Sequence, residues 1–309
     1  MTKGFRLPPR RRPAASLGVV VAIAVAIWVA LATPVEAERP APQRFGVTVT
    51  GAGPDVILIP GLASPGAVWE ATAARLSATH RVHVMHLAGF AGRAAGANAR
   101  GDIIEPMLAE LAAYAMTLDR PVLAGHSMGG LMSLELAARH PDMVGGVLVV
   151  DALPFYPLVM NPEATVEMAA PQAAMVKSQL MAQSDAQYVA GAPMTAARLA
   201  KSEHARVKVA EWAAASDRTV VAQAVSEVMV RDARPRLADI KAPVTVIVAW
   251  DTSMGGGAER LDELYAGAYS GLEGVTLKRI DDGYHFIMLD QPDVFARETD
   301  AFLARIPAK

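Results

Sequence analysis

Short apolar runs alternate with longer amphipathic stretches along most of the chain. Strands are predicted for residues 45–50, 56–59, 82–86, 122–124 and 147–150, where apolar residues are continuous or alternate with polar ones. Helices are predicted for residues 66–78, 103–117 and 127–140, where apolar side chains recur every three or four positions. Strands that alternate with helices of this length form mainly parallel sheets with helices on both faces.

This alternation stops after Asp151. Residues 153–234 are rich in alanine and methionine, have helical propensity and contain no convincing strand pattern. Strand patterns return at residues 244–249 and 275–280, and a final amphipathic helix begins at Pro292. We therefore expect an α/β core formed by residues 45–152 and 235–309, with a helical cap insertion at residues 153–234.

The first 37 residues have the order of features found in export signals. Basic residues precede an apolar run at residues 17–32, and small residues follow as far as Ala37. This run is shorter than the roughly 20 residues of a spanning helix, so we expect cleavage after Ala37 and a linker at residues 38–44. The mature protein is then expected to be periplasmic or secreted, without a stable membrane anchor. An uncleaved anchor and a simple hydrophobic tail are the alternatives. The run Arg10 to Arg12 permits a twin-arginine route, which the following residues match poorly.

Composition limits the partners and the chemistry. The chain has 309 residues, 52% hydrophobic and 19% charged, so a large buried core is expected. The formal net charge is −2, and removal of residues 1–37, with five basic residues and one acidic residue, would make it −6. We therefore expect no basic surface for nucleic acid. The absence of cysteine excludes disulfides and a cysteine-linked lipid, whereas the oligomeric state is not defined by the sequence.

The most informative motif is Gly125-His126-Ser127-Met128-Gly129. It has the form G-x-S-x-G and stands between an apolar strand and an amphipathic helix, the context of a nucleophile elbow. A serine on such a sharp turn is exposed for attack, and the N-terminus of the following helix favours a developing negative charge. The alternative is a glycine-rich turn whose serine only caps the helix. We interpret Ser127 as a candidate nucleophile.

A serine nucleophile needs a general base, and three histidines follow Ser127 in the chain. His140 ends the helix that begins at Ser127, about 20 Å away at 1.5 Å per residue, and His204 lies in the cap insertion. His285 follows the last predicted strand, at the end where open parallel sheets place their sites. The order serine, acid, histidine therefore favours His285 as the base.

Two aspartates compete for the role of the acid that orients His285. Asp251 follows the strand at residues 244–249, and Asp151 follows the strand at residues 147–150. Chain order and loop position favour Asp251, with Asp151 as the alternative acid. Asp281 and Asp282 are too close to His285 in sequence.

The oxyanion of a tetrahedral intermediate needs backbone N–H donors. The residue after the nucleophile, Met128, is the first candidate. The loop after the strand at residues 56–59 reads Pro60-Gly61-Leu62, and we expect Leu62 to supply the second donor because Gly61 permits the necessary turn.

The chain resembles the α/β-hydrolase superfamily, of the kind with a helical cap, over about residues 45–306. The resemblance rests on Pro60-Gly61-Leu62, the segment 87–92, the segment 125–130, Asp251 and the segment 283–286 before Gln291-Pro292. It implies a serine esterase or lipase-like fold. Pro60 stands where relatives commonly have histidine, and Trp250 where they have glycine before the acid. A serine nucleophile distinguishes the chain from dehalogenases and epoxide hydrolases of similar fold, which use aspartate.

The leading hypothesis is hydrolysis of a small-molecule carboxylic ester through a Ser127 acyl-enzyme. Alternatives are the same chemistry on an amide, a lactone, a carbon–carbon bond or in perhydrolysis, and a non-catalytic exported binding protein of the same fold. Histidines are not clustered at metal-ligand spacing and no G-x-G-x-x-G is present, so neither a metal nor a cofactor is expected. The methionine and aromatic side chains of residues 153–234 are expected to form mostly the interior of the cap rather than an acyl pocket.

Overall fold

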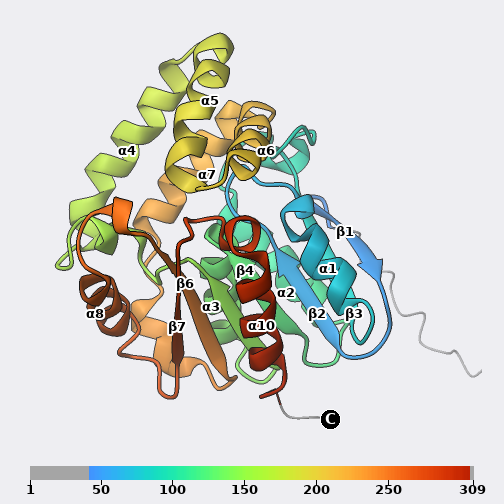
Figure 1. Ribbon diagram of the computed structural model, residues 1–309. Coiled ribbons are helices and arrows are strands. Elements are labelled where there is room, and N and C mark those ends of the chain that lie inside the picture. Colours follow the sequence, from blue (N-terminus) through green and yellow to red (C-terminus); the bar gives the residue numbers. More distant parts are fainter. Residues whose placement is uncertain (1–41, 307–309) are drawn as a thin grey trace, which may run out of the picture. The chain divides into compact units, whose positions relative to one another are not determined.

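Seven strands form one sheet in the order β1-β3-β2-β4-β5-β6-β7 in the computed structural model, which describes residues 42–306 (Figure 1). The strands are β1 (Phe45–Thr50), β2 (Asp55–Ile59), β3 (Arg81–Leu87), β4 (Val122–His126), β5 (Gly146–Val150), β6 (Val244–Trp250) and β7 (Thr276–Asp281). Strand β1 is antiparallel to β3, and all other neighbours are parallel. The mainly parallel sheet predicted from the sequence is therefore confirmed.

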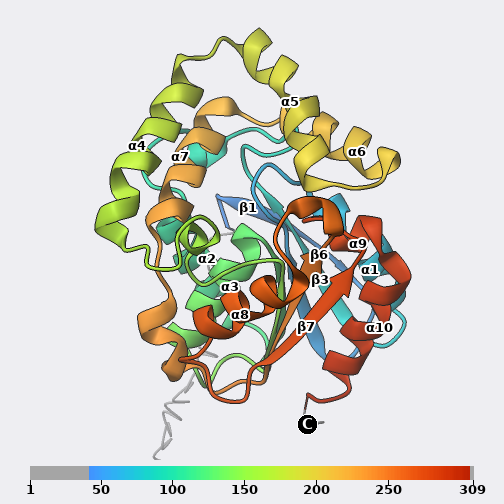
Figure 2. The same ribbon diagram turned by 60° about the vertical axis from the view of Figure 1, so that its left-hand side comes forward.

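Helices cover both faces of this sheet (Figures 1 and 2). The core helices are α1 (Glu70–Leu76), α2 (Ile104–Ala115), α3 (Met128–Arg139), α8 (Ala258–Ala268), α9 (Ile287–Asp290) and α10 (Pro292–Leu303), and the short 3₁₀ helices of the core are η1 (Gly66–Trp69), η2 (Gly96–Ala99), η4 (Arg234–Asp239) and η5 (Thr252–Met254). The region expected to be one helix at residues 66–78 is η1 followed by α1.

Two buried clusters lie on opposite sides of the sheet because successive side chains of a strand point to opposite faces. In β2, Ile57 and Ile59 belong to the cluster that contains residues of α2, α3 and α8, whereas Val56 and Leu58 belong to the cluster that contains residues of α1 and α10. All five residues of β2 are buried, as expected for a parallel strand covered on both faces.

Four helices form the segment between β5 and β6: α4 (Val166–Ala182), α5 (Asp185–Leu199), α6 (Glu203–Ala214) and α7 (Arg218–Val230), preceded by η3 (Tyr156–Val159). In both views they lie beyond one end of the sheet (Figures 1 and 2). Within residues 42–306, no helix combines the length and the apolar character needed to cross a membrane. The predicted export segment, residues 1–37, lies outside the described residues.

The expectation that methionine and aromatic side chains fill the interior of the cap is wrong for most of them. Tyr156 and five methionines are exposed, with exposed fractions of 43–68%: Met160, Met168, Met175, Met181 and Met194. The buried residues of α4 and α5 are instead alanines, Ala169, Ala173, Ala192 and Ala196. Small side chains at the contacts let the helices approach closely, which leaves the long methionine side chains on the outside.

Candidate active site

Ser127 occupies a strained turn between β4 and α3. Its backbone has φ 53° and ψ −120°, a conformation that costs energy for a residue with a side chain. The two motif glycines are required by close approaches. A Cβ at Gly125 would lie 2.1 Å from the carbonyl oxygen of Gly129, and a Cβ at Gly129 would lie 2.3 Å from the carbonyl oxygen of Ile59. The local sequence therefore forms the elbow that its pattern predicts.

His285 lies in the loop between β7 and α9, and its ring contacts Asp151. The distance from His285 Nδ1 to Asp151 Oδ2 is 2.7 Å, and the other carboxylate oxygen, Oδ1, accepts the backbone N–H of Ala249 at 2.9 Å. An ionised carboxylate only accepts hydrogen bonds, so in the neutral imidazole Nδ1 carries the proton and Nε2 keeps a lone pair. Asp151 also has a positive φ of 48°, a conformation that costs energy for a residue with a side chain.

The expected pairing of His285 with Asp251 is corrected by this geometry. Asp251 is buried, and its Oδ2 accepts Lys201 Nζ at 2.6 Å, while its Oδ1 accepts the backbone N–H of Ser253 at 2.8 Å and the Ser253 hydroxyl at 2.5 Å. The bond from Lys201 and those from Ser253 lower the pKa of the Asp251 carboxyl to about 2. Both carboxylate oxygens are thus engaged by groups other than the imidazole.

The two expected oxyanion residues lie beside Ser127. Leu62 and Met128 line the same cavity as the serine. A Cβ at Gly61 would lie 2.9 Å from His126 Nδ1 and 3.0 Å from the Cβ of Ser127, so glycine at this position lets the loop after β2 approach the elbow. Met128 is the first residue of α3, where backbone N–H groups have no partner within the helix.

His126 contributes a contact that the sequence motif did not reveal. Its Nε2 donates to the carbonyl oxygen of His285 at 2.9 Å, and the two ring centroids are 4.5 Å apart. The side chain is buried, and this burial, with a smaller effect from His285, holds the pKa of His126 well below its ordinary value. A neutral His126 therefore holds the main chain of His285. The position of His126 directly before Ser127 in G-x-S-x-G is the sequence feature that could have indicated this contact.

Asp290 joins the His285 loop to the helical segment above it. Its carboxylate accepts the backbone N–H groups of Lys201 at 2.8 Å, Ser202 at 2.9 Å and Tyr284 at 3.1 Å. In addition, the N–H of Phe286 donates to the carbonyl oxygen of Leu199 at 3.1 Å. The link between α5 and α6 is therefore fixed to the loop that carries His285. Sequence reasoning did not single out Asp290, although it lies between the motif segments 283–286 and Gln291-Pro292.

Ser127 and His285 open into one cavity of about 360 Å³, here called the site cavity. Its walls come from the loop after β2, the elbow and the helices α4 to α7, and the residues that line them are mostly apolar: Leu62, Ala63, Tyr156, Leu180, Tyr188, Ala192, Leu199, Val209, Trp212, Val221, Val225, Val228 and Phe286. The hydrogen bonds of residues 42–306 do not include one between Ser127 and His285, and such bonds often tighten only with substrate. No group of three potential metal ligands converges within the described residues.

A mainly parallel sheet with a strained serine elbow and a histidine loop at its carboxyl end defines an α/β hydrolase. The sequence matches the Alpha/beta hydrolase family over residues 56–298, and the chain belongs to that family.

Relatives and solved structures show a range of hydrolase activities. The chain is 34% identical over 116 residues to a pimeloyl-acyl-carrier protein methyl ester esterase of Vibrio atlanticus, a match that covers 37% of this chain and 42% of the relative. The match thus spans about two fifths of that relative's length. Among solved structures, an enol-lactonase from Burkholderia xenovorans has a TM-score of 0.68 at 19% identity, covering 84% of this chain and 96% of that one. A malate-bound thermophilic esterase from Thermogutta terrifontis has a TM-score of 0.69 at 21% identity, covering 85% and 94%. These two likenesses concern the fold.

Proposed function

We propose that the protein is a serine hydrolase that cleaves carboxylic esters with Ser127 as nucleophile, His285 as general base and Asp151 as the acid. The observation that carries the proposal is the contact between His285 Nδ1 and Asp151, in a histidine that lines the same cavity as the strained serine. This contact leaves Nε2 free to accept a proton. Neither Asp251 nor any metal takes part in the proposed reaction.

The reaction follows from these positions. Ser127 Oγ attacks the ester carbonyl carbon while its proton passes to His285 Nε2, and the N–H groups of Met128 and Leu62 stabilise the negative oxygen. The carbon–oxygen bond to the alcohol then breaks, and His285 gives its proton to the leaving alcohol. A water molecule, deprotonated by His285, attacks the acyl-enzyme and releases the carboxylic acid and Ser127.

The site cavity favours uncharged, apolar esters. Apart from the two histidines, the residues that line it carry no ionisable side chains other than the tyrosines Tyr156 and Tyr188, and burial raises the pKa of Tyr188 to about 12. A charged acyl or alcohol group would lose hydration there without a charged partner. The curated relative acts on a methyl ester by its name, which agrees with ester cleavage as the reaction class.

Ser127→Ala tests the proposal directly. Turnover of p-nitrophenyl butyrate should fall by about 10⁴-fold or more, and labelling by a fluorophosphonate probe should disappear. Thr195→Val is the matched control, because Thr195 lines the same cavity with a hydroxyl group and should keep both activity and labelling. Retained labelling in Ser127→Ala would show that the nucleophile lies elsewhere. A panel of an ester, a lactone and an amide of equal size would then identify the bond that is cleaved fastest.

A further inference from the structure

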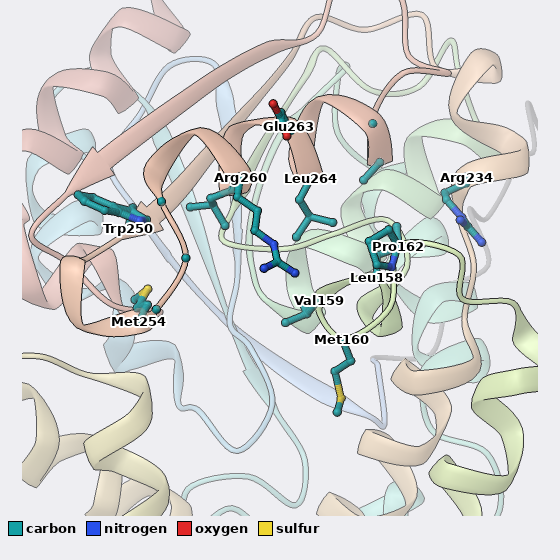
Figure 3. Close-up of a pocket in the computed structure, with 16 residues that line it drawn as sticks. Leu158, Val159, Met160, Pro162, Arg234, Trp250, Met254, Arg260, Glu263 and Leu264 are labelled. Atoms are coloured by element: carbon teal, nitrogen blue, oxygen red, sulfur yellow. The ribbon is translucent and has the colours of Figure 1, made fainter.

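A second cavity lies outside the site cavity and shares none of its lining residues. It has a volume of about 780 Å³ and is formed by η3 and the residues after it, by the end of β6 with the following loop, and by α8 (Figure 3). The 3₁₀ helix η3 separates the two spaces, since Tyr156 lines the site cavity whereas Leu158 and Val159 line the second cavity. The proposed ester hydrolysis makes no use of it.

Apolar side chains form much of the wall of the second cavity, and several are exposed. Val159, Met160 and Met254 have exposed fractions of 57%, 68% and 44%. Trp250 and Leu264 also belong to this wall (Figure 3). Large apolar side chains that are exposed together around a cavity are typical of a ligand-binding surface.

Two arginines lie among these apolar groups, and they differ in their partners. Figure 3 shows the guanidinium of Arg260 pointing into the space between Met254 and Val159, whereas the carboxylate of Glu263 points away from it. Within residues 42–306 the Arg260 side chain forms no ion pair and no hydrogen bond. The other arginine of the lining, Arg234, is already paired with Asp232 at 2.7 Å. Arg260 is therefore available for an anion from outside.

We propose that the second cavity binds a single-chain amphiphilic carboxylate, with its headgroup on Arg260 and its chain along Val159, Met160 and Leu264. A guanidinium can hold a carboxylate with two parallel hydrogen bonds. The apolar wall would contact the alkyl chain of the ligand, and the guanidinium of Arg260 would bind its one anionic headgroup. This proposal does not depend on the proposed ester hydrolysis.

Two helical glycines give a matched pair of variants that fill one cavity each. A Cβ at Gly267, which lines the second cavity from α8, would meet nothing within 4 Å, and the same is true of Gly191, which lines the site cavity from α5. Phenylalanine at either position therefore projects into open space rather than into packed atoms. Gly267→Phe should block the second cavity and Gly191→Phe the site cavity.

The test measures binding of decanoate, decanol and decyltrimethylammonium by isothermal titration calorimetry, each below its micelle concentration. Decanoate should bind about fivefold or more tightly than decanol, and decyltrimethylammonium more weakly than both. Arg260→Gln should remove the advantage of decanoate over decanol, Gly267→Phe should weaken decanoate binding, and Gly191→Phe should leave decanoate binding unchanged. Circular dichroism melting curves check that each variant is folded.

Three results would overturn the proposal. Unchanged decanoate affinity in Arg260→Gln would show that the arginine does not hold the headgroup. Loss of binding in Gly191→Phe but not in Gly267→Phe would place the ligand in the site cavity. Equal affinity for decanoate and decyltrimethylammonium would show that the charge of the headgroup does not determine binding. Because binding is measured without turnover, none of these results bears on whether Ser127 is a nucleophile.

Discussion

Asp151→Asn exchanges one oxygen of the proposed acid for an amide nitrogen, and we expect it to remove most of the activity. Oδ1 of Asp151 accepts the N–H of Ala249 at 2.9 Å, while Oδ2 faces His285 Nδ1 at 2.7 Å. In the variant, the amide oxygen keeps the bond from Ala249 and the NH₂ group faces the imidazole. Nδ1 must then accept, so the proton of the neutral ring moves to Nε2, which can no longer act as a base.

The wrong tautomer should lower kcat by about 10³–10⁴-fold, the size of effect seen when an acid of this kind becomes an amide. KM should change little, because Asp151 does not line the site cavity. Steady-state kinetics with p-nitrophenyl butyrate measures both constants.

Asp251→Asn is the matched control, since it makes the same change at the other candidate acid. Asp251 contacts Lys201 and Ser253 rather than the imidazole, so kcat should stay within about threefold of the native value. A large loss in Asp251→Asn together with a small loss in Asp151→Asn would refute the assignment of the acid and restore the choice made from chain order. Equal large losses with normal melting curves would also contradict it.

Two further predictions follow from the hydrogen bonds. Asp290→Asn should lower kcat/KM by about tenfold, because one amide oxygen cannot accept all three N–H groups that fix the His285 loop to the cap. Asp282→Asn is the control: its side chain is exposed, and kcat/KM should change by less than about twofold. The two arginines beside Glu105, mainly Arg139, lower its pKa to about 2 from an ordinary value of 4.5. Its stabilisation is therefore fully present above about pH 4.5 and lost as the pH falls towards 2. Urea unfolding at pH 7 should show Glu105→Gln to be less stable than native protein by about 1 kcal/mol after allowance for solvent screening. Most of this difference should be lost at pH 2, and Glu273→Gln should have no effect at either pH.

The sequence predicted the sheet, most core helices and the loops that carry Ser127 and His285, because each of these depends on local patterns. Residues 56–59 of β2 are an uninterrupted apolar run, and the elbow glycines are fixed by contacts within a few ångströms of Ser127. Such features are encoded by short segments whose residue types have few alternatives.

The choice between Asp151 and Asp251 could not be made from the sequence. Strands β5 and β6 are parallel neighbours, with Val150 opposite Ile247, so both aspartates emerge at the same edge of the sheet. What separates them is the direction of each side chain and the partners already present. Asp151 turns back with positive φ towards His285, and Lys201, supplied by the distant link between α5 and α6, engages Asp251. Neither property leaves a pattern in the sequence.

The distribution of backbone strain gives independent support for the location of the site. Six residues other than glycine have positive φ within the described chain, and all but Arg120 follow the carboxyl end of a strand: Ala63 after β2, Ala91 after β3, Ser127 after β4, Asp151 after β5 and Asp282 after β7. Glycine would adopt these conformations without cost. Each larger residue at these positions therefore lowers the stability of the folded protein, and five of the six lie at the carboxyl edge of the sheet. Two of the five are the proposed nucleophile and the proposed acid. Two of the five, Ala63 and Ser127, line the site cavity. Because these positions are identified from dihedral angles and not from the serine motif, the location of the site does not depend on the motif alone.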